Sequence, residues 1–225
     1  MNFTKVKETT SNHGRAIEAF QNKVAPRYIY LLAGVHGDEP EGVYVLHQWW
    51  SWIKEQKIDI PFIVIPCLNP DGIHHHHRWN ANKVDLNRNL PTQDWTDQHK
   101  EKKYFPGESP MSEVENIFLD ECLQSFSPAY IFSFHSWKRI LNINGPEKKI
   151  VQLISRHNKY PVDSDIGYPT PGSFGTYGVE KYNTSVLTFE LPPKENDINF
   201  EMIWNENKSA LCNNDLMDLL RDRVT

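Results

Sequence analysis

The stretch RYIYLLAGVHGDEPEGV, residues 27–43, begins as an apolar run and ends in a glycine-containing bend. A short apolar run bounded by turn residues is typical of a buried strand. His36 and Glu39 lie in the bend, and Pro40 opens residues 40–56, whose apolar positions have helical spacing. The stretch therefore predicts a strand, a tight turn and a helix, which is the unit that builds α/β folds.

Three further apolar runs of this kind lie along the chain. They are PFIVIPCLN (61–69), PAYIFSFHS (128–136) and NTSVLTFEL (183–191). Amphipathic stretches lie between and after them: residues 112–126 begin with a Ser112/Glu115 capping box, and residues 200–222 predict one long helix. Strands that alternate with helices indicate a three-layer α/β/α sandwich with a mixed, mainly parallel central sheet. We expect residues 1–225 to form a single domain.

Composition and charge argue against several classes of protein. Of the 225 residues, 39% are hydrophobic and 24% are charged, which is typical of a globular chain and not of a disordered one. The formal net charge is -5 and the pI is near 6.1, so we expect no nucleic-acid partner, because phosphate contacts need a concentrated basic surface. No apolar stretch has the length of a membrane span or the character of a secretory signal, so we expect a cytoplasmic location and no membrane partner.

Ionisable residues are concentrated where the predicted strands end. The four strand ends read GVHGDE, LNPDG, FHSW and FELPP. In an open α/β sheet, ligands bind at the carboxyl ends of the parallel strands. We therefore expect these residues to gather along one edge of the sheet. Residues 71–110 and 160–180, which are rich in Pro, Gly and Asn, are expected to form long loops over that edge.

His36, Glu39 and His135 are candidate metal ligands. The glycine-containing bend allows the first imidazole and the carboxylate to face one point, and His135 ends another predicted strand. A catalytic zinc ion usually has three protein ligands of these types and one water molecule. A lone pair of this kind is more often a surface histidine and a helix N-terminal glutamate, but the other polar strand ends favour a site for one zinc ion per chain.

Glu190 is the candidate general base. It ends a strand that otherwise consists of β-forming residues, and a carboxylate is seldom buried there unless it is paired or functional. Beside a water molecule whose pKa zinc lowers to about 7, Glu190 can take the proton during attack and pass it to the leaving amine. A structural salt bridge is the alternative interpretation.

The loop RWNANKVDLNRNLP, residues 78–91, contains candidate substrate-binding residues. An arginine with an asparagine beside it can bind a free carboxyl group, which suits Asn87 and Arg88. Arg78 can instead stabilise an oxyanion. Asp85 can accept the second ring N–H of the first histidine and fix its tautomer. A polar loop without such a role would be solvated surface.

Together these motifs resemble those of the zinc metallocarboxypeptidases. GVHGDE resembles the HxxE zinc motif, DLNRNLP the Asn-Arg carboxylate clamp, SFHS the strand with the third ligand and TFEL the strand with the general base. LNPDG, NANKVDLNRNLP, GYPTPGSFGTYG and FELPP are similar to segments of the small bacterial murein peptide amidases, from about residue 28 to about residue 195. Those enzymes remove meso-diaminopimelate from the γ-D-glutamyl bond of cell-wall peptides.

The resemblance implies a role for each matching residue. The implied zinc ligands are His36, Glu39 and His135. The implied catalytic residues are Glu190 as general base and Arg78 as oxyanion donor. The implied substrate-binding residues are Asn87 and Arg88 for the carboxylate, Tyr168 as a mobile tyrosine that closes over the substrate, and Ser173, Phe174 and Thr176 in a specificity loop. Tyr177 is a weaker alternative to Tyr168.

Two segments depart from the pattern of the amidases. After the third ligand the chain reads SWKRILNING where those enzymes have an Asp-Pro pair, so Lys138 and Arg139 are expected to add positive charge near the substrate. The run IHHHHRW, residues 73–79, is expected to be a solvated turn and not a second metal site, because clustered histidines bind a metal only when their geometry converges.

The main hypothesis is a zinc-dependent carboxypeptidase or amidase. It would cleave the terminal amide bond of a small peptide with a free C-terminal carboxylate, with the γ-D-glutamyl-meso-diaminopimelate bond of murein tripeptide as the expected target. One alternative is an N-acyl amino acid deacylase of the succinylglutamate desuccinylase and aspartoacylase type. A second alternative is a non-catalytic protein that binds zinc or a peptide. The sequence leaves the oligomeric state open.

Overall fold

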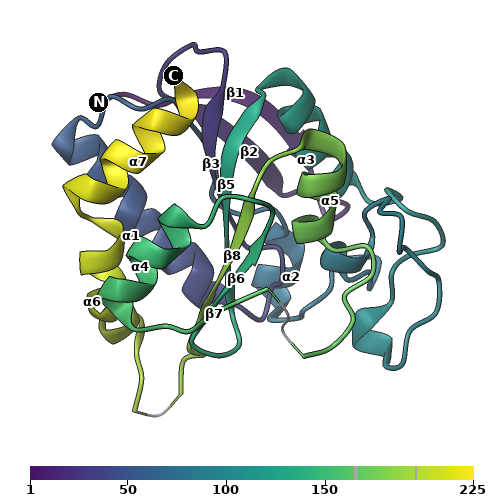
Figure 1. Cartoon of the computed structure of the whole chain (residues 1–225). Coiled ribbons are helices and arrows are strands. Elements are labelled where there is room, and N and C mark those ends of the chain that lie inside the picture. Colours follow the sequence, from purple (N-terminus) through teal and green to yellow (C-terminus); the bar gives the residue numbers. More distant parts are fainter. Residues whose placement is uncertain (165–166, 196) are drawn as a thin grey trace.

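Four parallel strands form the centre of the sheet, and they are the four apolar runs of the sequence (Figure 1). They are β3 (Tyr28–Ala33), β4 (Phe62–Ile65), β5 (Pro128–Ser136) and β8 (Val186–Leu191). Every residue of β3, β4 and β5 is buried, which explains why these runs are largely apolar instead of alternating. The structure is a computed structural model that describes residues 1–164, 167–195 and 197–225.

Four further strands, which the sequence did not predict, extend the sheet on both sides. They are β1 (Thr4–Thr10), β2 (Ala16–Gln21), β6 (Ile140–Asn144) and β7 (Val162–Asp163). The order across the sheet is β1-β2-β4-β3-β5-β8-β6-β7, with β2 antiparallel to β4 and β6 antiparallel to β8. β1 and β2 are partly exposed and mix apolar with polar residues, so they lack the continuous apolar run of a buried strand.

Helices cover both faces of the sheet (Figure 1). One face packs against α1 (Pro40–Gln56), α4 (Lys149–Asn158), α6 (Phe200–Leu211) and α7 (Asn214–Val224). The other face packs against α3 (Val114–Ser125) and α5 (Phe174–Tyr182). Each layer has its own apolar cluster, one containing Trp49 and the other containing Tyr30. The predicted three-layer α/β/α sandwich with a mixed sheet is confirmed.

The C-terminal segment, residues 200–222, forms two helices and not the single helix predicted. α6 ends before Cys212, and the side chain of Asn213 accepts the N–H of Leu216 at 2.9 Å, which caps the start of α7. Asparagine favours such caps over helix interiors because its side chain competes for backbone hydrogen bonds. The two asparagines at residues 213–214 are therefore a sequence signal for the end of one helix and the start of the next.

The predicted capping box does not form, and the predicted loops contain short helices. α3 begins at Val114, and the hydroxyl of Ser112 donates to the carboxylate of Glu113 at 2.7 Å instead of capping the helix. The first predicted loop contains α2 (Pro70–His75), η1 (Leu86–Arg88) and η2 (Lys102–Tyr104), and α5 begins in the second. These helices are too short to produce a clear helical periodicity in the sequence.

Buried amide and carboxylate groups hold the loop of residues 78–90 against the start of α3. Nδ2 of Asn80 donates to the carboxylate of Glu113 at 2.7 Å and to that of Glu115 at 3.0 Å. Oε1 of Glu115 is buried and has no hydrogen-bond partner among the described residues. Burial raises the pKa of Glu115 to about 7. The loop is therefore attached to the fold by directional side-chain contacts and not by regular secondary structure.

All eight described strands belong to one sheet, and a single domain over residues 1–225 stays a prediction. Among the residues that the structure describes, no helix has both the length and the apolar composition needed to cross a bilayer. The cytoplasmic location stays a prediction.

Glu115→Gln should make the free energy of unfolding less dependent on pH. The folded-state pKa of Glu115 is raised from 4.5 to about 7, so its contribution to stability is fully present below pH 4.5 and is lost as the pH rises through 7. Glutamine stays neutral, so variant minus wild-type stability should rise by roughly 1 to 3 kcal/mol between about pH 5 and about pH 8. Urea unfolding at a series of pH values measures this difference, and a constant difference contradicts the prediction.

Candidate metal centre

Two imidazoles and one carboxylate from separate parts of the chain meet at the carboxyl ends of β3 and β5. Nδ1 of His36 lies 2.8 Å from Oε1 of Glu39, and Nδ1 of His135 lies 2.9 Å from Oε2 of the same carboxylate. The two Nδ1 atoms are 3.2 Å apart. All three side chains are buried. The structure thus brings together the three residues that the sequence selected as metal ligands.

The bend after β3 gives His36 and Glu39 this arrangement. Gly34 has a φ of +66°, a left-handed conformation that favours glycine. At Gly37, a Cβ atom would lie 1.9 Å from the carbonyl carbon of Gly72, so any side chain there would collide with α2. Glu39 is the N-cap residue of α1, which fixes the direction in which the chain leaves the bend. The bend can therefore pack directly against the neighbouring loop.

The donor set fits a metal ion such as zinc. Ligand atoms about 2.0 to 2.2 Å from a tetrahedral ion lie roughly 3.3 to 3.6 Å apart. The separations in this cluster are 2.8, 2.9 and 3.2 Å, so a small outward movement accommodates an ion. Among the described residues, this is the only group of three or more His, Cys, Asp or Glu whose ligand atoms converge. His36, Glu39 and His135 can therefore hold a metal ion.

The histidine run at residues 74–77 lies elsewhere and is exposed. It forms the end of α2 and the residues that follow, and the ring of His75 packs at 5.7 Å from that of His13. The run is not part of the converging ligand group found in the described chain. Its exposure agrees with the expectation of a solvated turn.

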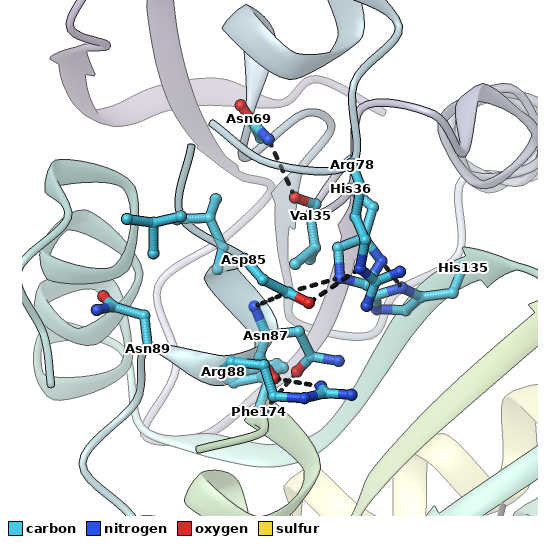
Figure 2. Close-up of polar contacts among 12 residues, drawn as sticks. Val35, His36, Asn69, Arg78, Asp85, Asn87, Arg88, Asn89, His135 and Phe174 are labelled. Carbon is cyan, nitrogen blue, oxygen red and sulfur yellow. Dashed lines mark hydrogen bonds and ion pairs between the residues drawn. The ribbon is translucent and has the colours of Figure 1, made fainter. Parts of the chain in front are cut away.

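A second carboxylate, Asp85, orients both His36 and Arg78 (Figure 2). Its Oδ1 lies 3.1 Å from Nε2 of His36 and accepts the backbone N–H of Asn87 at 2.9 Å, while its Oδ2 accepts the Nε–H of Arg78 at 2.9 Å. Burial alone would raise the pKa of Asp85, but the charges of Arg78 and His36 hold it well below its usual range. A proton on Nε2 of His36, shared with Asp85, leaves the lone pair of Nδ1 directed at the cluster.

The cluster is arranged to hold positive charge. Burial and the charge of Arg78 disfavour protonation of His36, but the carboxylates of Glu39 and Asp85 outweigh them and raise its pKa to about 9. Burial would raise the pKa of Glu39, yet the two imidazoles lower it well below its usual range. Burial lowers the pKa of His135. A buried carboxylate that stays ionised among nitrogen donors has the electrostatic properties of a cation site.

Glu190 stands beside the cluster because of the register of β5 and β8. In this parallel pair, Glu190 lies opposite His135. Its Oε2 is buried and has no hydrogen-bond partner among the described residues. Burial, followed by repulsion from Glu39, raises the pKa of Glu190 to about 8. A carboxylate of this kind accepts a proton readily near neutral pH, which a general base requires.

A pocket of about 590 Å³ lies in front of the cluster and Glu190, and Arg78, Asn87 and Arg88 also line it. Arg78 pairs with Glu39 and Asp85. Arg88 is only 5% exposed and donates to the carbonyl oxygen of Asn87 at 2.7 Å, but it forms no ion pair with any residue that the structure describes. A buried cation without a counter-charge is suited to binding an anionic group of a ligand.

Only part of the predicted specificity loop reaches the pocket. Tyr168 and Ser173 line it, but Phe174 and Thr176 do not. Phe174 packs into the apolar layer between α5 and the sheet, and the hydroxyl of Thr176 contacts that of Ser173. Tyr177, the weaker alternative to Tyr168, is buried and donates to a carboxylate of α3. The cause is α5, whose first turn directs side chains toward the sheet where the sequence predicted a loop.

Several pocket residues were missed in the sequence. Trp137 lies two residues after His135, and Asn142 and Asn144 lie on β6. The two asparagines had a signal, because amides two residues apart on a strand face the same side. Tyr104 comes from η2, and no pattern in the sequence pointed to it. The direction of a side chain in an irregular loop depends on contacts with residues far away in the sequence.

The two basic residues after the third ligand behave differently from each other. Nε of Arg139 pairs with Glu206 of α6 at 2.6 Å, and Arg139 does not line the pocket. Nζ of Lys138 lies 4.1 Å from the centre of the Trp137 ring. The expectation of positive charge near the substrate therefore fails for Arg139, because α6 supplies a partner that the sequence did not predict.

The chain is similar to proteins named murein peptide amidase A. It is 31% identical to the protein of Escherichia coli strain K12 over 179 aligned residues. The alignment covers 74% of this chain and 72% of that protein. It is 30% identical to the protein of Vibrio campbellii over 183 aligned residues, and that alignment covers 76% of this chain and 72% of the relative. Residues 25–130 match the family described as succinylglutamate desuccinylase/aspartoacylase catalytic domain.

Solved structures share this fold. The murein-tripeptide amidase of Escherichia coli O157 superposes with a TM-score of 0.72 at 27% identity and covers 94% of this chain and 89% of its own. Carboxypeptidase A of Helicoverpa armigera has a TM-score of 0.76 at 18% identity, over 99% of this chain and 68% of its own, which shows the fold alone. The donor set of the cluster fits a metal ion, and the identity of that ion stays a prediction.

His135→Ala should lower the affinity for Zn²⁺ by more than about 100-fold. Mutating a residue that only holds a metal ligand in place already lowers metal affinity about 10- to 100-fold, and His135 is a proposed ligand itself. Competition with a chromophoric chelator measures the affinity. His76→Ala is the matched control, because it removes an exposed imidazole outside the cluster and should leave the affinity unchanged. Equal affinity in His135→Ala and wild type contradicts the assignment.

Proposed function

The chain belongs to the murein peptide amidase A family, and on this basis we propose that it is a zinc-dependent hydrolase that cleaves the terminal amide bond of a small peptide with a free C-terminal carboxylate. The proposed target is the γ-D-glutamyl-meso-diaminopimelate bond of murein tripeptide. One observation carries the proposal. His36 and Glu39 of the ligand cluster, Glu190 and the buried Arg88 line the same pocket, and Oε2 of Glu190 has no hydrogen-bond partner among the described residues.

Glu190 is the proposed general base. The chemistry that zinc supplies when bound by His36, Glu39 and His135 is polarisation of the scissile carbonyl and a lower pKa for the attacking water. Glu190 takes a proton from that water at its free Oε2 and delivers it to the leaving nitrogen as the C–N bond breaks. The products are a carboxylate on one fragment and a free amine on the other.

The two arginines have separate proposed roles. Asp85 holds Arg78 through Nε, and Nη1 of Arg78 lies 3.5 Å from Oε1 of Glu39, which leaves Nη2 for the oxyanion that forms at the scissile carbonyl. Arg88 and Asn87 bind the terminal carboxylate of the substrate. Oδ1 of Asn87 accepts the backbone N–H of Phe174 at 2.7 Å (Figure 2), which leaves the amide nitrogen of Asn87 available to a ligand in the pocket.

The polar lining of the pocket supports a substrate with a polar side chain. Asn142, Asn144, Ser173 and Thr188 all line the pocket. Amide and hydroxyl groups can hydrogen-bond a polar side chain, and an aliphatic or aromatic side chain offers them no such bond. The side chain of meso-diaminopimelate has an ammonium and a carboxylate group, which suits this lining. Tyr168 is 40% exposed at the same pocket and is the proposed cover over the bound peptide.

Murein tripeptide should be a better substrate than a γ-D-glutamyl peptide that ends in leucine. With zinc loaded, kcat/KM for release of meso-diaminopimelate should exceed that for release of leucine from a γ-D-glutamyl peptide with C-terminal leucine by at least about 100-fold, because the leucine side chain offers no hydrogen bond to the polar groups of the pocket. Chromatography of the released amino acid measures both rates. A preference for leucine, or no hydrolysis of either peptide by the zinc-loaded protein, contradicts the proposal.

An N-acyl amino acid deacylase is the second candidate, and the match of residues 25–130 to the desuccinylase and aspartoacylase catalytic domain favours it. That match ends before His135, Tyr168 and Glu190. It therefore omits the part of the chain that shapes the far side of the pocket. Faster hydrolysis of acyl amino acids than of murein tripeptide, measured in the same assay, would favour this candidate.

Glu190→Gln should lower kcat by about 100- to 10,000-fold, because positioned acid-base groups contribute about that much, while zinc binding stays unchanged. Steady-state kinetics and metal analysis on the same sample measure both quantities. Glu201→Gln, an exposed glutamate on α6, is the control with unchanged kcat. Full activity in Glu190→Gln removes Glu190 from the mechanism, and inactivity of the wild type on every substrate would favour the non-catalytic alternative.

A further inference from the structure

The ring of Tyr104 contacts both arginines of the pocket. Tyr104 ends η2, a single turn in the long loop before α3. The guanidinium carbon of Arg78 lies 5.2 Å from the centre of the ring, and that of Arg88 lies 5.5 Å from it. Among the described aromatic residues, Tyr104 is the only one with cation–π contacts to these two arginines. One side chain is therefore coupled to the proposed oxyanion donor and to the proposed carboxylate binder.

This contact matters most for Arg88. Arg78 is already fixed by Asp85 at 2.9 Å. Arg88 has no ion pair within the described chain, and its polar contact is to the adjacent carbonyl of Asn87. The electron-rich face of the Tyr104 ring attracts a guanidinium and restricts its orientation without neutralising its charge. Arg88 thus stays available to an anionic ligand while its side chain is held in place.

Tyr104 also separates two cavities. A second cavity of about 320 Å³ adjoins the catalytic pocket, and the two share Arg88, Tyr104 and Tyr168. The far side of the second cavity is formed by residues 96 and 98–101 together with Pro106, Pro169 and Pro171. The three shared side chains therefore form the wall at the position where the carboxylate of a bound peptide would end.

We propose that Tyr104 restricts the enzyme to substrates that end at the carboxylate bound by Arg88. This inference rests on the proposed function. A peptide that continued past that carboxylate would have to pass between Arg88, Tyr104 and Tyr168 into the second cavity. The Tyr104 ring blocks this path and holds Arg88 toward the terminus. Tyr104 is thus a positioning and specificity residue and takes no part in the bond-breaking step.

Tyr104→Ala tests the proposal with two peptides, murein tripeptide and the same peptide extended by one glycine at the C-terminus. For the tripeptide, KM should rise about tenfold, or roughly 1.4 kcal/mol, which is within the range of two cation–π contacts. Its kcat should stay within about twofold, because the ring does not touch the reacting atoms. The ratio of kcat/KM for the extended peptide to that for the tripeptide should rise at least about tenfold, because the two cavities join.

Two further variants distinguish the effect of the Tyr104 ring from that of its hydroxyl and from a general disturbance of the loop. Tyr104→Phe keeps the ring and should restore both KM and the preference for the tripeptide. Lys102→Ala lies on the same turn, is exposed and lines neither cavity, and it should match wild type. An unchanged ratio in Tyr104→Ala, or a loss confined to kcat, overturns the proposal. So does a Tyr104→Phe variant that behaves like Tyr104→Ala.

Binding distinguishes this proposal from the proposed function. Calorimetric titration of both peptides into zinc-loaded Glu190→Gln measures affinity without turnover. Adding Tyr104→Ala to that protein should weaken tripeptide binding about tenfold and reduce the discrimination against the extended peptide. Tyr104→Leu, which keeps much of the volume without the π face, should weaken tripeptide binding in the same way if alanine prevents folding. Tight tripeptide binding in both variants overturns the inference even if no peptide is hydrolysed.

Discussion

The parallel register of β5 and β8 is the constraint on which the candidate site depends. It places His135 opposite Glu190, and the pairing of β5 with β3 brings His36 to the same edge of the sheet. Because side chains alternate along a strand, a shift of one residue would turn Glu190 to the opposite face. The stacked rings of Phe134 and Phe189, one position earlier on each strand, are buried against the helical layer and oppose such a shift. Apolar packing thus fixes the geometry of the ionisable residues.

Buried charge is compensated by ion pairs within the cluster, whereas Glu190 and Arg88, which line the same pocket, form no ion pair with any described residue. Glu39 and Asp85 lie among His36 and Arg78, so the favourable interactions offset the cost of removing these charges from water. Oε2 of Glu190 has no hydrogen-bond partner, and the guanidinium of the buried Arg88 has no counter-ion, within the described chain. A buried ionisable group without an ion pair at a pocket is suited to binding a charged or hydrogen-bonding ligand. Glu190 and Arg88 both line the pocket, where a substrate would provide such partners.

Much of that pocket is built on a loop that has almost no regular secondary structure. Hydrogen bonds from side-chain amides hold this loop in place of a backbone ladder: Nδ2 of Asn116 donates to the carbonyl of Leu86 at 2.9 Å, and Nδ2 of Asn89 donates to that of Pro106 at 2.8 Å. These contacts bind the loop to α3 and close its two arms on each other. Arg88 and Tyr104 lie on the two arms, so their mutual contact depends on this attachment. A loop fixed in this way can present binding residues as precisely as a helix or strand.

The sequence by itself determined the four central strands, because parallel strands covered on both faces are apolar over their whole length. It also indicated His36, His135 and their partners, since strand ends in such a sheet gather on one edge. The edge strands could not be predicted, because their partly exposed faces leave no comparable pattern. Only the tertiary structure decided that Phe174 points into the core and that Tyr104 joins the two arginines. The direction of such a side chain is set by contacts with residues far away in the sequence, and those contacts exist only after the chain has folded.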